Sequence, residues 1–145
     1  MKRSFALIGI AVIGVVLTVA ACGSKTGTNG GISTGKVIKA VPVGNLTATL
    51  SNDSGVLRHG NQEFMLSLTD ASGKAIDVGA VSLSFHMPQM GGMAAMTDSV
   101  TFTTTNTPGV YRGKVNLEVG GEWQAQLAYE GPAGNGKTTF SVTAQ

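Results

Sequence analysis

Methionine and histidine are concentrated in one short stretch, which reads HMPQMGGMAAM from position 86 to 96. His86 begins the stretch, and four methionines follow at a spacing of three residues, namely Met87, Met90, Met93 and Met96. A thioether sulfur is soft and uncharged and selects Cu(I) over harder ions, and an imidazole nitrogen is also a copper ligand. Thioethers need no deprotonation, so such a group could hold the ion at mildly acidic pH. The stretch therefore predicts a copper site, with Cu(I) as the expected ion, formed by some of these five side chains.

Two other interpretations of the methionine stretch are compatible with the sequence. Methionine fills irregular gaps, so the stretch could pack over the open end of a domain. Methionine-rich surfaces also adapt to varied partners, so the stretch could bind a protein without any metal. The second histidine, His59, lies between Arg58 and Gly60 in a loop-like segment, and we expect it at the surface and outside the site.

The local sequence places these side chains between two strands. Pro88 has no N–H to donate and disfavours helix at the residue before it, and the two glycines that follow weaken a helix further. We expect a loop between a strand that ends near Phe85 and one that begins near Ser99, with a short helical turn at 92–96. Such a loop would bring several thioethers within reach of one point.

The segments on both sides of this loop alternate between apolar and polar residues. Alternation with one apolar face is typical of half-buried antiparallel strands, and clusters of Gly, Pro, Asn and Asp separate the segments. Trp123 is expected in the core, where its indole N–H needs a partner. About seven short strands predict an all-β fold, an immunoglobulin-like antiparallel β-sandwich. Apart from the strand near Ser99, the alternating segments are 46–50, 63–69, 81–86, 111–117, 123–129 and 138–142.

The start of the chain has the pattern of an export signal. A positive beginning at Lys2 and Arg3 precedes an uncharged apolar segment at 5–21, which suits a secretory signal or a membrane anchor. The segment ends in small residues before Cys22 and resembles the lipobox of bacterial lipoproteins. In lipoproteins the peptidase cuts before the cysteine, whose sulfur then carries diacylglycerol, so the resemblance implies lipidation of Cys22. A plain transmembrane helix is the alternative.

These features divide the chain into three parts. We expect a lipoprotein signal peptide at 1–21, a lipidated cysteine with a flexible linker at 22–36, and a folded domain at 37–145. The linker is rich in Gly, Ser and Thr and buries too little apolar surface to order itself. The expected location is the cell envelope, with the domain anchored to a membrane and facing the periplasm or the cell exterior.

Composition argues against several classes of protein. The formal net charge of +2 comes from Lys2 and Arg3, and without them eight basic residues balance eight acidic ones. No cluster of Lys or Arg would follow a phosphate backbone, so we expect no nucleic-acid partner. Cys22 is the single cysteine, which leaves the domain without a thiolate metal site or a cysteine nucleophile. No serine-hydrolase or zinc-protease motif is present either, so we do not expect an enzyme.

Short pieces of the domain occur in an order that is typical of one family. They are Gly60-Asn61-Gln62-Glu63-Phe64, Asp70-Ala71-Ser72-Gly73-Lys74, Val81, Met87-Pro88-Gln89-Met90, Pro108-Gly109-Val110-Tyr111 and Gly121-Glu122-Trp123. From about residue 55 to 143 the chain resembles the YtkA-like domain, which is related to the FixH-like proteins of bacterial envelopes. The resemblance implies a membrane-tethered immunoglobulin-like sandwich without catalytic activity, and a role in copper handling or in assembly of copper-containing oxidases. The expected partner is a copper-receiving protein or a membrane protein complex. The alternative is a metal-independent module that docks on such a complex.

Overall fold

The computed structural model describes residues 35–145, and this part of the chain is built from β-strands. The predictions of a signal peptide at 1–21 and of lipidation at Cys22 lie outside the described residues. Among the residues described, no helix is long and apolar enough to cross a membrane. The strands are β1 (Lys36–Val43), β2 (Leu46–Asn52), β3 (Gly60–Thr69), β4 (Ala80–Met87), β5 (Met96–Ser99), β6 (Thr101–Thr104), β7 (Val110–Leu117), β8 (Gly121–Gly131) and β9 (Gly134–Ala144).

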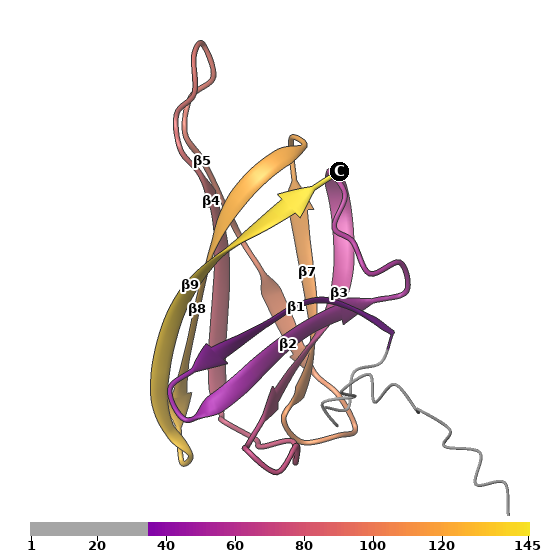
Figure 1. Ribbon diagram of the computed structural model, residues 1–145, viewed down its shortest axis with the longest axis vertical. Helices are drawn as coiled ribbons and strands as arrows, with labels where there is room; N and C mark the ends of the chain where they lie inside the picture. The colour runs from indigo at the N-terminus through magenta and orange to yellow at the C-terminus, as the bar shows by residue number, and fades with distance from the viewer. Residues whose placement is uncertain (1–34) are drawn as a thin grey trace, which may run out of the picture.

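The strands form two antiparallel sheets (Figure 1). One sheet has five strands in the order β1-β2-β3-β7-β6, and the other has four in the order β5-β4-β8-β9. The prediction of an all-β antiparallel sandwich is confirmed. The described residues contain nine strands where we expected about seven, because the sequence pattern did not reveal β1 or the short polar strand β5.

The core lies between the sheets and is built from the apolar positions of the alternating strands. Phe64 of β3 and Phe85 of β4 come from different sheets, and their rings meet edge to face with centroids 6.4 Å apart. Trp123 is fully buried, as predicted, and its indole Nε1 donates a hydrogen bond to the carbonyl oxygen of Val119 at 3.1 Å. These contacts give β4 a firmly packed inner face, which fixes the base of the segment that follows it.

The chain changes sheets between β5 and β6. Strand β5 pairs with β4 in one sheet, whereas β6 pairs with β7 in the other, so each is the edge strand of its sheet. Val100 stands at the crossing, and its N–H donates to the carbonyl oxygen of Leu83 at 2.9 Å. One side of the sandwich is therefore bordered by two short, consecutive edge strands, and the methionine stretch leads into the first of them.

Candidate functional site at the β4–β5 hairpin

The methionine stretch forms a β-hairpin that extends well beyond the body of the sandwich (Figure 1). At its tip Met90 and Met93 exchange two backbone hydrogen bonds, with N···O distances of 3.3 and 2.9 Å. Gly91 occupies the first turn position with a φ of +56°, and Gly92 the second, which matches a type II′ turn. The expected helical turn at 92–96 is therefore wrong, and Met96 is instead the first residue of β5.

The hairpin divides the four methionines into two cross-strand pairs. Met87 is opposite Met96 at the base, and Met90 is opposite Met93 at the tip. Directly opposed residues project on the same face, with Cβ atoms about 4.5–5.5 Å apart. The two pairs are three residues apart along the strand, which corresponds to about 10 Å. The structure thus sets the methionines opposite one another two by two, and not around the single shared point that we expected.

Burial separates the two pairs further. Met87 is 2% exposed and belongs to the hydrophobic core, and Met96 is partly buried against that core. Met90 and Met93 are 53% and 45% exposed, and we call these two residues the tip pair. We expected Met87 among the ligands, but its place in the core removes it from any accessible group of donors.

His86 points away from the methionine that follows it. Adjacent residues of a strand project to opposite faces, and because Met87 points inward, His86 lies on the outer face of β4. Its Nδ1 atom is 3.0 Å from the Oγ1 atom of Thr97, the residue opposite it on β5. His86 is four residues, or about 13 Å of extended strand, from Met90. The structure therefore does not bring His86 next to the tip pair.

The second histidine lies where the sequence placed it. His59 is exposed, and its Nδ1 atom is 3.1 Å from the carbonyl oxygen of Gln145 at the end of the chain. It lies outside the hairpin. Among residues 35–145, no three side chains of the His, Cys, Asp and Glu types come together as a potential metal-binding group.

A partly buried carboxylate, one of whose oxygen atoms has no hydrogen-bond partner, lies at the base of the hairpin. Asp98 of β5 is opposite Phe85, so its side chain is directed to the inner face of the sheet. Its Oδ2 atom is buried without a hydrogen-bond partner. Burial raises the pKa of Asp98, and the negative charge of Glu118 raises it further. An inward-pointing charge on an edge strand also opposes pairing with other chains, which suits a strand at the border of the sandwich.

Replacing Asp98 by asparagine is expected to stabilise the domain by about 1 kcal/mol at neutral pH, because a poorly solvated charge is removed. The folded pKa of Asp98 lies above the unfolded one. The stability that the protonated form of Asp98 gives the fold is therefore fully present below the unfolded pKa. It is lost as the pH rises through the folded pKa. The advantage of Asp98→Asn should grow over that window in urea unfolding at several pH values. A variant less stable than wild type at neutral pH would contradict this account.

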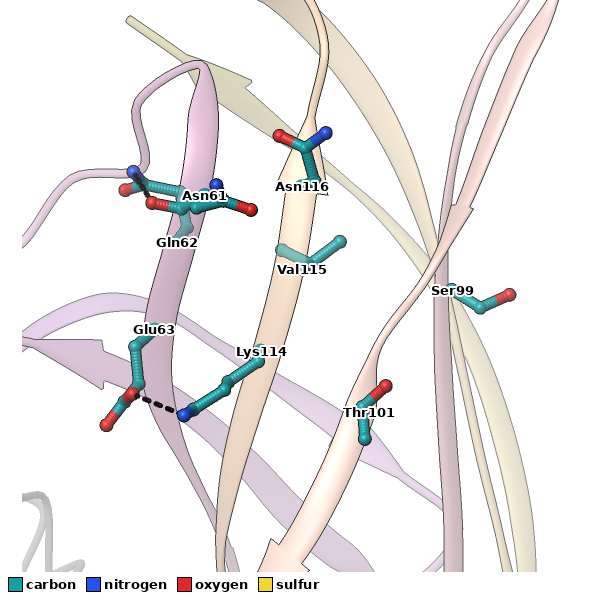
Figure 2. Close-up of a pocket in the computed structure, with 8 residues that line it drawn as sticks. All are labelled: Asn61, Gln62, Glu63, Ser99, Thr101, Lys114, Val115 and Asn116. Atoms are coloured by element: carbon teal, nitrogen blue, oxygen red, sulfur yellow. Dashed lines mark hydrogen bonds and ion pairs between the residues drawn. The ribbon is translucent and has the colours of Figure 1, made fainter.

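A polar hollow of about 500 Å³ lies elsewhere, over β3, β7 and the crossing from β5 to β6 (Figure 2). Within it the Glu63 carboxylate pairs with Lys114 Nζ at 3.5 Å, and the same carboxylate contacts Arg112 Nε at 3.4 Å. All three side chains are about half-exposed or more, and the single carboxylate offsets one of the two positive charges. The hollow has neither methionine nor histidine in its lining, so it offers no soft donor. Its lining residues are Asn61, Gln62, Glu63, Ser99, Thr101, Lys114, Val115 and Asn116.

The fold and the hairpin define an all-β sandwich that presents two methionines on a projecting tip. The sequence profile described as YtkA-like matches residues 41–128, which is more than half of the chain and includes the whole hairpin. The chain therefore belongs to the YtkA-like family. No curated protein and no solved structure matches it.

Proposed function

We propose that this chain is a membrane-anchored envelope lipoprotein, lipidated at Cys22, that binds Cu(I) through the tip pair for copper handling or copper-oxidase assembly. The observation that carries the proposal is the cross-strand pairing of Met90 and Met93 at the exposed end of the hairpin. Two soft, neutral donors on one face, held by a tight turn, suit a soft monovalent ion. The stretch from Met87 to Thr97 carries no charged residue that would favour a harder ion.

The small number of donors indicates what kind of binding to expect. Met87 is in the core, Met96 packs at the base, and His86 is about 13 Å of extended strand from Met90, so the tip pair supplies two sulfurs. Coordination positions remain open, and a donor from another protein can enter them. An ion held in this way can pass between proteins by ligand exchange. The proposal therefore includes a copper-receiving protein or a membrane protein complex as the partner.

A Cu(I) competition titration tests the proposal. The protein is titrated without oxygen against a chromogenic Cu(I) chelator, and the amount of ion withdrawn from the chelator gives the stoichiometry and affinity. We expect one Cu(I) per chain. If the protein withdraws no Cu(I) from the chelator, even at the lowest chelator concentration that keeps the ion in solution, the proposal is refuted.

The exposed hairpin also supports a second candidate, a metal-independent module that docks on a membrane protein complex. The tip pair is apolar, exposed and placed beyond the sandwich, and methionine adapts to varied apolar surfaces. Leucine keeps the apolar surface but has no sulfur, whereas serine loses both. Capture of a membrane complex that tolerates Met90→Leu/Met93→Leu and a copper chelator, but fails with Met90→Ser/Met93→Ser, would favour this candidate. If Met90→Leu/Met93→Leu already abolishes capture, the result favours the copper proposal.

A further inference from the structure

The methionines of the domain differ widely in their access to solvent. Of the six in the sequence, all but Met1 lie in the described residues. The tip pair is about half-exposed, Met65 and Met96 are intermediate in exposure, and the side chain of Met87 is only 2% exposed. Residues 35–145 contain no cysteine that would react first. Oxidation of sulfur side chains follows exposure, so the tip pair is where a thioether oxidant acts first.

We propose that the tip pair is a reversible sulfoxidation site, and that its oxidation switches off the copper donors. The second part of this inference rests on the function proposed above. The oxidant is a peroxide: the thioether sulfur of Met90 or Met93 attacks one oxygen of hydrogen peroxide, and the O–O bond breaks. The sulfur gains that oxygen and loses two electrons, while the other oxygen leaves as water with both protons.

Oxidation replaces a soft donor with a polar sulfoxide, whose oxygen is a hard ligand. Cu(I) prefers soft ligands, so each oxidation removes a useful donor from the pair. The fold should tolerate the change, because the tip pair contacts solvent and the buried Met87 keeps its place in the core. The site thus responds to oxidant without unfolding the domain that carries it.

The same exposure permits reversal. Methionine sulfoxide is reduced by dedicated reductases, one for each epimer at sulfur. In this reduction two thiols of the enzyme become a disulfide, and the sulfoxide oxygen leaves as water. Apart from the glycine and its two chain neighbours, no heavy atom lies within 4 Å of where a Cβ would stand on Gly91 or Gly92, so the turn beside the tip pair is open. The hairpin also extends away from the sandwich (Figure 1), which lets a reductase approach the tip.

Limited oxidation of the full-length protein in detergent tests the site. The protein is treated with dilute hydrogen peroxide, quenched at intervals, digested and analysed by mass spectrometry for added oxygen at each methionine. We expect Met90 and Met93 to be oxidised at least about 10-fold faster than Met87, with Met65 and Met96 between them. Incubation with the two methionine sulfoxide reductases should restore both tip residues. Oxidation of Met87 or Met65 as fast as the tip pair would overturn the inference.

The copper measurement on the same samples separates this inference from the proposed function. Cu(I) affinity should fall about 10-fold or more after tip oxidation and recover after reduction. Met65→Leu is the matched control and should show the same fall and recovery, because its tip pair is intact. If untreated protein binds no Cu(I), the proposed function fails, while the oxidation map alone still decides the modification site. If the tip is oxidised selectively and Cu(I) affinity does not change, the switch is overturned.

Discussion

Replacing both tip methionines by leucine is expected to lower Cu(I) affinity by at least about 100-fold, which corresponds to about 2.7 kcal/mol of binding free energy. The physical reason is that Met90→Leu/Met93→Leu removes both soft donors while keeping apolar side chains of similar size. Because the tip pair is exposed, the domain should remain folded with almost unchanged stability. The measurement is the chelator competition described above, made on wild type and variant under the same conditions.

Two single substitutions are controls for the loss of sulfur. Met65→Leu removes a partly exposed methionine on β3, outside the hairpin. Met87→Leu removes the buried methionine at the base of the hairpin. Each should bind Cu(I) with nearly the wild-type affinity, because each retains the tip pair. If Met87→Leu weakened binding as much as the double tip variant, the assignment of the donors would be wrong.

Shortening Met87 to alanine is expected to destabilise the domain by about 2–5 kcal/mol, because a buried methionine leaves a cavity when it is truncated. Met87 is 2% exposed and joins a core to which both sheets contribute. The same truncation at Met90 should change stability by about 0.5 kcal/mol or less, since its side chain is largely in solvent. Urea unfolding of Met87→Ala and Met90→Ala measures both effects.

One outcome of comparing Met87→Ala with Met90→Ala would contradict the different roles of the two methionines. The two residues are of the same type and are three positions apart in the same hairpin, so the comparison removes the same side-chain atoms from a buried and from an exposed position. Equal losses of stability would mean that the tip packs against something, or that Met87 does not contribute to the core. A large loss at Met87 alone supports the division of the four methionines into one structural and one exposed pair.

The strands that form the core could be predicted from sequence because burial follows their period of two. In β7 and β8 the buried positions alternate almost without interruption, and Trp123 lies at one of them. Strand β1 does not show this pattern: apart from the partly buried Ile38 its first half is exposed, and a register shift occurs between Val37 and Lys39. Strand β5 is short and polar at an edge, so no apolar face distinguished it from a loop.

The candidate site was only partly predictable, because the spacing of three has different meanings in a helical turn and in a hairpin. A helical turn gathers such side chains on one face, which is why we expected one point of convergence. In a hairpin the same spacing sets residues opposite one another in pairs. The signal was present in Gly91-Gly92, since two glycines between extended segments indicate a two-residue turn. The pairing of His86 with Thr97 had no comparable signal, because it depends on the register.

The most direct test of copper binding by the tip pair is an NMR titration of protein labelled with ¹³C at the methionine methyl groups. Each methyl group is bonded to the sulfur in question and reports separately. Stoichiometric Cu(I), added without oxygen, should shift the signals of Met90 and Met93 and leave those of Met65 and Met87 in place. If all the methyl signals stay unchanged, or if those of Met65 and Met87 move while the tip signals do not, the tip pair does not bind Cu(I).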